Sequence, residues 1–178
     1  MNAIEHDLQY STPIGARRRG IIAGAIAAVL TPHSSFAATD TDTFSVTATV
    51  VDACVITAND HDFGNYNPVS GADVDASSTI DVTCTPSASY TVELNAGATV
   101  GGVISARLMT DGSNTLEYNL YTDAGRTTVW GDGTASSVTA AGTGSGAQQS
   151  LTVYGRIPAS QSVPAGSYSD TVTATINF

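Results

Sequence analysis

Few side chains in this 178-residue chain have the chemistry of a catalytic site. A nucleophilic hydrolase needs a base beside its serine or cysteine, and histidine is the usual base. Of the three histidines, His6 and His33 lie in a segment with the features of an export signal, which leaves His61 alone. The G-x-S-x-G motif of many serine hydrolases does not occur. We therefore expect no enzyme, and we assign neither catalytic nor cofactor-binding residues.

Metal binding has equally little support. The runs Asn59-Asp60-His61-Asp62 and Asp73-Val74-Asp75 gather carboxylates but lack the oxygen spacing of an EF-hand loop, so solvated turns are the simpler interpretation. Two cysteines and one histidine cannot supply the usual four zinc ligands. We expect no metal and no small-molecule cofactor.

Residues 1–37 have the features of a cleaved signal peptide. Three arginines at 17–19 precede an apolar run at 20–30, and small residues at 35 and 37 fit a cleavage site. The apolar run, of about eleven residues, is shorter than the roughly twenty that span a bilayer. We expect a protein exported through the periplasm.

Cleavage after Ala37 would leave one domain of ordinary size with fourteen acidic residues, three arginines and no lysine, a net charge of about −11. Nucleic acid is excluded as a partner because its binding needs clustered Lys and Arg. In an oxidising compartment, two cysteines with none left over predict one disulfide, Cys54–Cys84.

The remaining sequence has the texture of an all-β protein. Thr, Val, Ser, Tyr and Gly dominate, and short apolar runs alternate with turn-forming clusters, as in an antiparallel sandwich. The uncharged, small-residue stretch 134–149 is predicted to be an exposed loop. The expected strands are 43–50, 53–58, 78–85, 89–95, 103–109, 115–122, 149–157 and 167–178.

Trp130, Tyr118, Tyr121 and Tyr154 could suggest a sugar-binding platform. Tyr118 shares its parity with Leu120, whereas Tyr121 has the other parity, so these aromatics divide between core and surface. A core role is the preferred interpretation.

The segment 43–50 alternates polar and apolar residues without a break. Phe44, Val46, Ala48 and Val50 fall on one face of an extended chain. Such a strand can pair with its own sheet, which gives a monomer, or leave and complete a neighbour, which gives a fibre. From the residues alone, both remain open.

The last expected strand, 167–178, repeats this pattern. Val172, Ala174, Ile176 and Phe178 share one parity, and Asp170 interrupts the apolar series. A core strand is the simplest interpretation. The alternative is that it borders an open sheet edge that an assembly partner grasps.

Several motifs follow one another in a characteristic order, and together they strongly resemble the spore coat protein U domain family, which includes subunits of archaic chaperone–usher pili. The resemblance covers about residues 44–178. The motifs are Cys54, Phe63-Gly64-Asn65-Tyr66, Ile80-Asp81-Val82-Thr83-Cys84, Arg107-Leu108-Met109, Leu116-Glu117-Tyr118-Asn119-Leu120-Tyr121, Trp130-Gly131-Asp132-Gly133, Tyr154-Gly155-Arg156-Ile157-Pro158 and Pro164-Ala165-Gly166-Ser167-Tyr168-Ser169-Asp170.

The resemblance implies an immunoglobulin-like antiparallel β-sandwich at 53–178 that lacks its last strand. It also implies an N-terminal donor-strand extension at 38–52, whose Phe44, Val46, Ala48 and Val50 fill a neighbour's groove. A periplasmic chaperone, contacted by the C-terminal strand, would cap the groove first. An outer-membrane usher would then exchange the chaperone for another copy or a related subunit.

The leading hypothesis is therefore a structural pilus subunit for surface adhesion and biofilm formation, found on the cell surface. A coat protein secreted onto a spore or cell surface is the second hypothesis. The third is a self-contained periplasmic or secreted binding module whose strand 43–50 pairs within its own sheet.

Overall fold

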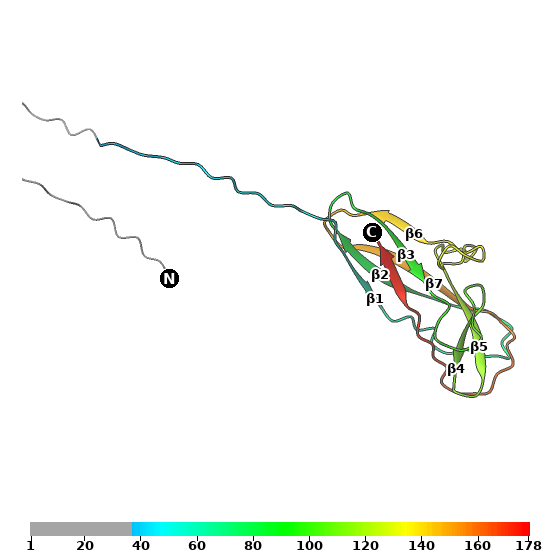
Figure 1. The fold of residues 1–178 in the computed structure, drawn as a ribbon. Coiled ribbons are helices and arrows are strands. Elements are labelled where there is room, and N and C mark those ends of the chain that lie inside the picture. Colours follow the sequence, from blue (N-terminus) through cyan, green and yellow to red (C-terminus); the bar gives the residue numbers. More distant parts are fainter. Residues whose placement is uncertain (1–36) are drawn as a thin grey trace, which may run out of the picture. The chain divides into compact units, whose positions relative to one another are not determined.

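The computed structural model describes residues 37–178, so the predicted signal peptide lies outside the described residues except at its last position. Residues 37–46 contain no helix or strand, and no helix within 37–178 is long and apolar enough to cross a membrane. Residues 47–178 form a separate unit (Figure 1). Its strands are β1 (Cys54–Ala58), β2 (Val74–Cys84), β3 (Ser89–Leu94), β4 (Arg107–Thr110), β5 (Thr115–Tyr121), β6 (Ala140–Thr143), β7 (Gln149–Ile157) and β8 (Ala174–Asn177).

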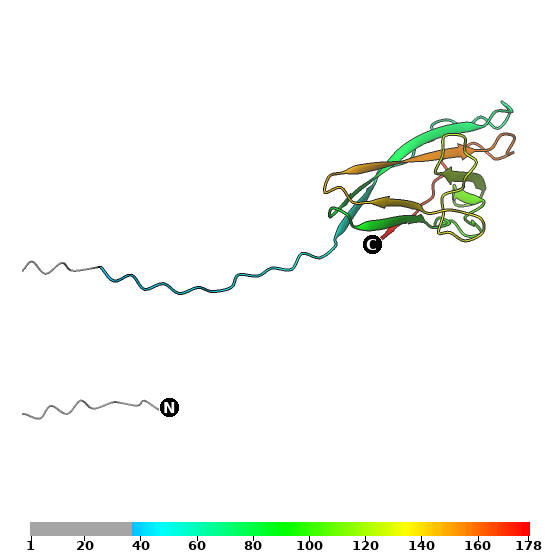
Figure 2. The ribbon, with the colours of Figure 1, turned by 90° about the horizontal axis from the view of Figure 1, so that it is seen from above.

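The strands form two layers, which Figure 2 shows from above. One sheet has the order β1-β2-β7-β5-β4 and the other the order β6-β3-β8, and every pair of neighbouring strands is antiparallel. The longest pairing, β2 with β7, runs from Val74 opposite Ile157 to Val82 opposite Gln149. The predicted all-β, immunoglobulin-like antiparallel sandwich is confirmed.

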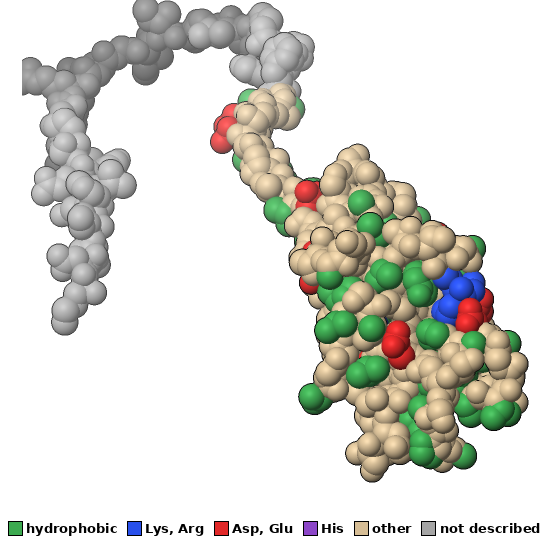
Figure 3. Space-filling model, turned by 90° about the vertical axis from the view of Figure 1, so that its right-hand side faces the viewer, with side chains coloured by type: hydrophobic (Ala, Val, Ile, Leu, Met, Phe, Trp, Pro, Cys, Tyr) green, Lys and Arg blue, Asp and Glu red, His purple; other side chains and the backbone are tan. Residues whose placement is uncertain are grey.

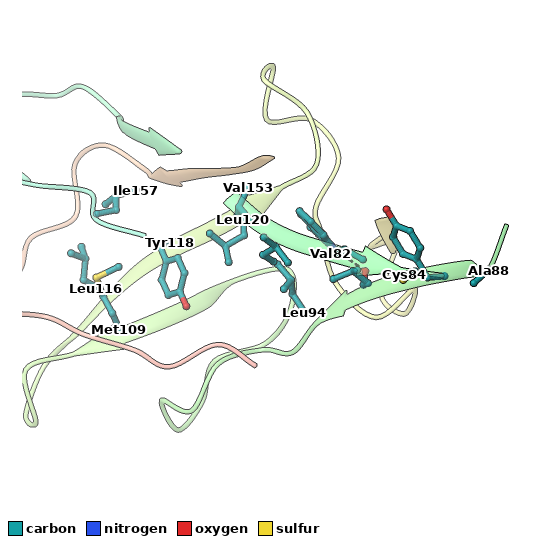
Figure 4. Close-up of a cluster of buried hydrophobic side chains, with 14 residues drawn as sticks. Val82, Cys84, Ala88, Leu94, Met109, Leu116, Tyr118, Leu120, Val153 and Ile157 are labelled. Atoms are coloured by element: carbon teal, nitrogen blue, oxygen red, sulfur yellow. Dashed lines mark hydrogen bonds between the residues drawn. The ribbon is translucent and has the colours of Figure 1, made fainter. Parts of the chain in front are cut away.

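The core lies between the two layers because alternate residues of each strand face inward. In β3, Tyr90, Val92 and Leu94 are buried, and β2 contributes Ile80 and Val82 from the opposite sheet. Figure 4 shows the side chains of both sheets meeting along one continuous layer.

The core interpretation of the aromatic residues is confirmed for Trp130 and Tyr118, which are 1% and 4% exposed. The Trp130 indole donates a hydrogen bond to the Val92 carbonyl at 2.9 Å. Tyr121 and Tyr154 are half-buried, as expected for residues of the other parity.

A buried arginine ties the two sheets together beside Trp130. Arg107 in β4 is fully buried and donates to the Trp130 carbonyl at 2.8 Å and to Asn119 Oδ1 at 2.7 Å. Its Nε donates to the Asn95 carbonyl at 2.9 Å. Burial lowers the pKa of Arg107, although these oxygens satisfy the guanidinium.

The two partly buried arginines lie against acidic side chains. Arg156 makes a bidentate contact with Asp75, at 2.8 and 2.9 Å, and approaches Asp73 at 3.3 Å. Arg126 lies 3.2 Å from the same Asp75. Figure 3 shows basic and acidic side chains adjacent on one face. Among residues 37–178, these two arginines therefore form no free basic patch.

The prediction of a loop over 134–149 is wrong, because residues 140–143 form β6 and pair with β3. The small residues there serve close packing, since a Cβ at Gly142 would overlap the ring of Tyr90. A sequence rich in Gly, Ala and Ser resembles a linker. Here the absence of a side chain at Gly142 lets β6 lie close against the ring of Tyr90.

Two other expected strands are shorter than predicted. Residues 103–106 form a tight turn, and β4 begins at Arg107. Within 167–178 only β8 is a regular strand, because its partner β3 ends at Leu94. Residues 43–50 form no strand in this structure.

The predicted disulfide is present, and it joins residues that face each other in the β1–β2 ladder. It fixes the start of β1, the outermost strand of its sheet, to the next strand.

We expect a Cys54→Ser, Cys84→Ser double variant to lose roughly 3–4 kcal/mol of unfolding free energy, the value for a closed loop of this size. Urea unfolding would measure the loss, and the reduced wild-type chain should match the variant; an unchanged midpoint in both would contradict the expectation.

Candidate functional site

A groove of about 670 Å³ opens between two segments that lie far apart in the sequence. Residues 58–68, which start at the last residue of β1, form one wall, and residues 163–174, which precede and enter β8, form the other. The floor consists of core side chains from both sheets. These are Ile80, Leu94, Met109, Leu116, Tyr118, Leu120, Val153 and Ile157.

The groove exists because two edge strands stop short. β1 is the last strand of the five-stranded sheet and β8 the last strand of the other sheet. β1 and β8 lie close together, but β1 ends at Ala58 and β8 begins at Ala174. Beyond these points no strand from residues 37–178 covers the edge of the sandwich, and the groove reaches core side chains.

The first wall packs against β7 through two aromatic rings. The rings of His61 and Phe63 lie 4.7 Å apart, edge to face, over Gly155. A Cβ at Gly155 would overlap the His61 ring and come within 2.7 Å of Phe63, so only glycine leaves room for this wall. Tyr66 secures its far end by donating to the Pro158 carbonyl at 3.1 Å.

His61 has a structural rather than a catalytic environment. Its Nδ1 lies 2.9 Å from Ser78 Oγ, but its Nε2 is buried and has no hydrogen-bond partner among the described residues. Such a pair lacks the third group that orients the base of a hydrolase. Burial, followed by the charge of Arg126, lowers the pKa of His61 against the opposing effect of Asp62.

Three of the carboxylates in the runs 59–62 and 73–75 have structural roles. Asp62 accepts from the backbone N–H of Gly64 at 2.8 Å, within a turn, and Asp73 and Asp75 pair with Arg156. Within residues 37–178, no group of three or more potential ligand side chains is placed to hold a metal ion.

The second wall is an extended segment with strict alternation. Tyr168, Asp170, Val172 and Ala174 are half-buried, while the residues between them are exposed. Residues 163–166, 169 and 171 also line the groove, but from 168 to 174 the half-buried positions are every second residue.

Asp170 anchors this wall to the rest of the sandwich. Its Oδ1 accepts from the N–H groups of Ala98 and Thr99 and from the Thr99 hydroxyl, each at 2.9 Å. Its Oδ2 accepts from the Tyr118 hydroxyl at 2.7 Å. Burial alone would raise the pKa of Asp170, but hydrogen bonds from Tyr118 and Thr99 lower it overall. In the sequence, Asp170 is visible only as a charged residue that interrupts the apolar series of the last expected strand. That interruption is the one sequence feature that could have indicated the anchor.

Tyr118 joins the two walls across the floor. Its ring packs edge to face on Phe63 of the first wall, with 6.0 Å between centroids, and its hydroxyl binds Asp170 of the second wall. Burial, and then the Asp170 contact, raise the pKa of Tyr118 far above its ordinary value. The tyrosine is thus a permanent hydrogen-bond donor.

The second wall leaves one backbone edge free. Ser169 exchanges two backbone hydrogen bonds with Thr110, and Thr173 accepts from the Asn95 N–H at 3.1 Å, so odd-numbered residues face the neighbouring chain. In an extended chain the N–H and C=O groups of even-numbered residues then point the other way, toward the groove. β1 likewise has β2 on one side only. A strand lying in the groove could pair with the free backbone edge of the second wall.

Two of the four predicted chaperone-contact residues, Val172 and Ala174, line this groove. Ile176 packs against the core, and Phe178 is 60% exposed. The predicted donor residues Phe44, Val46 and Val50 are 88%, 82% and 88% exposed, and Ala48 is exposed as well.

The domain is thus a disulfide-linked β-sandwich of immunoglobulin-like arrangement with an open apolar groove. Residues 40–175 match the model of the Spore Coat Protein U domain family. The chain belongs to that family. Membership supports the expectation of a structural protein rather than an enzyme.

Two known proteins are similar to it. Protein U of Myxococcus xanthus is 33% identical over 157 residues, which is 80% of this chain and 87% of that protein. A chain of the CsuC–CsuE chaperone–tip adhesion subunit pre-assembly complex, from archaic chaperone–usher Csu pili of Acinetobacter baumannii, matches with a TM-score of 0.52 and 26% identity. That match covers 73% of this chain and 40% of the other, so this protein spans less than half of that chain.

The Tyr118–Asp170 contact yields a stability prediction. Replacing Tyr118 with Phe keeps the ring on Phe63 but leaves Asp170 without one donor, which should lower the unfolding free energy by roughly 1.5–3 kcal/mol. Tyr121→Phe is a matched control, since Tyr121 is half-buried and outside the groove. Urea titration of the three proteins tests this; equal losses for both variants would contradict the role of the contact.

His61 yields a pH prediction. Because folding lowers its pKa below 6.5, the unfolded chain takes up the proton first, and stability should fall as the pH drops below about 6.5. His61→Gln should flatten the slope of unfolding free energy between roughly pH 6.5 and 5, a window above the ordinary pKa of carboxylates. Urea midpoints across this range give the slopes; identical slopes for variant and wild type would show that His61 titrates normally.

Proposed function

We propose that this protein is a structural subunit of a chaperone–usher pilus and assembles by donor-strand complementation. The observation that supports it most is the groove, which lies beside the free backbone edge of residues 168–174 and opens onto the core. An uncovered apolar edge of this kind is an aggregation hazard that exported proteins must cap. An added strand caps it with backbone hydrogen bonds along the edges and alternate side chains in the groove.

The segment 43–50 has the features that such a strand requires. It offers four apolar residues at alternate positions and polar threonines and a serine between them, and its side chains are exposed. Each valine or phenylalanine buried in the groove should contribute roughly 1.5–3 kcal/mol, and Ala48 less. Together with the backbone ladder, this makes a tight, slowly dissociating joint between subunits.

The partners follow from this mode of assembly. A periplasmic chaperone would fill the groove beside Val172 and Ala174 until an outer-membrane usher exchanges it for the arm of another copy or a related subunit. Family membership and the likeness to a chaperone–subunit complex of Csu pili support this order. The fibre would lie on the cell surface and serve adhesion and biofilm formation.

A coat protein secreted onto a spore or cell surface is the second candidate, because Protein U of Myxococcus xanthus resembles this chain over most of its length. Chaperone and usher genes beside the gene for this protein, or a chaperone that co-purifies from periplasm, would favour the pilus.

A third candidate, a self-contained binding module, requires 43–50 to pair within its own sheet. It would give a single species on gels with or without heating.

The arm provides the test of polymerisation. Val46→Asp should be exported and should fold with its chaperone, yet fail to polymerise, because a carboxylate would enter an apolar groove. Thr47→Asp is the matched control: it adds the same charge one residue away, on the face that points out of the groove. Unheated denaturing gels should show a ladder for wild type and Thr47→Asp that collapses to one band on boiling. A normal ladder for Val46→Asp would rule out the proposed role of the arm.

A further inference from the structure

We propose that the first wall of the groove, residues 58–68, is an acid-sensitive flap. Protonation of His61 undocks the middle of this wall from β7 while the rest of the sandwich stays folded. All the contacts involved lie within one domain, so the flap does not depend on the proposed function.

The first wall is tied to the sandwich at its two ends. At one end, the backbone N–H of Asn59 donates to the Thr79 carbonyl at 3.0 Å, and the Asn59 amide donates to the Thr79 hydroxyl at 2.8 Å. At the other end, the Tyr66 hydroxyl donates to the Pro158 carbonyl at 3.1 Å and accepts from the Gln161 N–H at 2.9 Å. Neither end involves a group that changes its charge near neutral pH.

The middle of the wall depends on two side chains. Residues 60–65 make no backbone-to-backbone hydrogen bond with any other segment of residues 37–178. Within this stretch His61 and Phe63 are half-buried, and the other residues are exposed. Both rings lie over Gly155 of β7. The packing of these two rings therefore decides whether the middle of the wall is docked.

The site accepts a neutral imidazole better than a charged one. The Nδ1 atom of His61 lies 2.9 Å from Ser78 Oγ, and a hydroxyl can either donate to this nitrogen or accept from it. The Nε2 atom is buried against Gly155 and has no partner among the described residues. The imidazolium donates from both nitrogens, so protonation leaves a buried N–H and a positive charge without an acceptor.

The charges around the ring do not remove this penalty. Arg126, from the segment that follows β5, donates to the carbonyl of that same glycine at 2.9 Å and places a second cation nearby. Asp75 of β2 lies 3.2 Å from this arginine. Asp60 and Asp62, on the wall itself, are exposed. Burial and Arg126 outweigh the opposing effect of Asp62, and the pKa of His61 is lowered.

Acid therefore favours the undocked wall. In the docked wall the pKa of His61 lies below 6.5, whereas in an undocked, solvated wall it returns to its ordinary value. The undocked wall takes up the proton more readily, so its population rises as the pH falls below about 6.5. The ratio of undocked to docked wall should rise by up to about tenfold per pH unit, until the docked form is protonated as well.

Undocking would change the groove itself. The ring of Phe63 would leave Tyr118, on which it packs edge to face, and one of the two walls would move away from the floor. The second wall would stay in place, because Asp170 holds it through groups outside residues 58–68. The groove would widen from one side only.

The chain contains natural probes for both parts of this proposal. The NMR signals of the Phe63 ring are shifted by the two aromatic rings packed on it, and Phe44 and Phe178 provide exposed references. Trp130 is the one tryptophan of the chain and is buried in the core, so its fluorescence reports on the whole sandwich.

A pH titration of the monomeric exported chain, labelled with ¹³C in phenylalanine and histidine, tests the flap. Between about pH 7.5 and about pH 5, above the ordinary pKa of carboxylates, the Phe63 signals should move toward those of Phe44 and Phe178. The midpoint should match that of the His61 ring signals, and Trp130 fluorescence should stay constant. His61→Gln, a polar side chain that does not titrate, should abolish the movement of the Phe63 signals.

Each other outcome contradicts the flap. Phe63 signals that stay in place down to about pH 5, or that move with a midpoint different from that of His61, would overturn it. A simultaneous change in Trp130 fluorescence would show that the whole sandwich unfolds instead. Should His61→Gln already be undocked at neutral pH, the agreement or disagreement of the two midpoints in the wild-type chain still decides the question.

Discussion

The open groove depends on one side chain, the carboxylate of Asp170. Residues 163–173 belong to no regular strand, yet they form a defined wall. Asp170 makes this possible because it binds two backbone N–H groups and a hydroxyl of the 98–99 loop and also takes the Tyr118 hydroxyl. Without this carboxylate, the segment would lose the four hydrogen bonds that fix it to the 98–99 loop and to Tyr118.

The opposite wall is held by a different kind of contact. His61 and Phe63 stack over a glycine of β7, and Tyr118 connects Phe63 to Asp170. Both walls are therefore fixed to the same floor before any partner arrives. A preformed site loses less conformational entropy on binding than one that must be ordered first. The proposed assembly requires a groove of this kind, which can accept an added strand without first being ordered.

The local pattern of residues predicted much of this fold. β7 was expected at 149–157 and lies at those residues, since alternation and flanking turns define it locally. The Cys54–Cys84 pair and the burial of Tyr118 and Trp130 were likewise predictable. β6 was missed because Ala140–Thr143 carries small residues whose purpose appears only beside the Tyr90 ring. The groove could not be derived from periodicity, because it depends on where two edge strands stop. Asp170 likewise acts through Tyr118, a partner 52 residues away.

The position of the disulfide has a mechanical consequence. Tension on the chain ahead of Cys54 enters the domain at the first residue of β1, a five-residue strand at the edge of its sheet. Pulled alone, such a strand would peel away one hydrogen bond at a time. The bond to Cys84 instead passes the load to β2, an eleven-residue strand that pairs along most of its length with β7. Force then reaches the middle of the larger sheet, where many hydrogen bonds must break together before the domain extends.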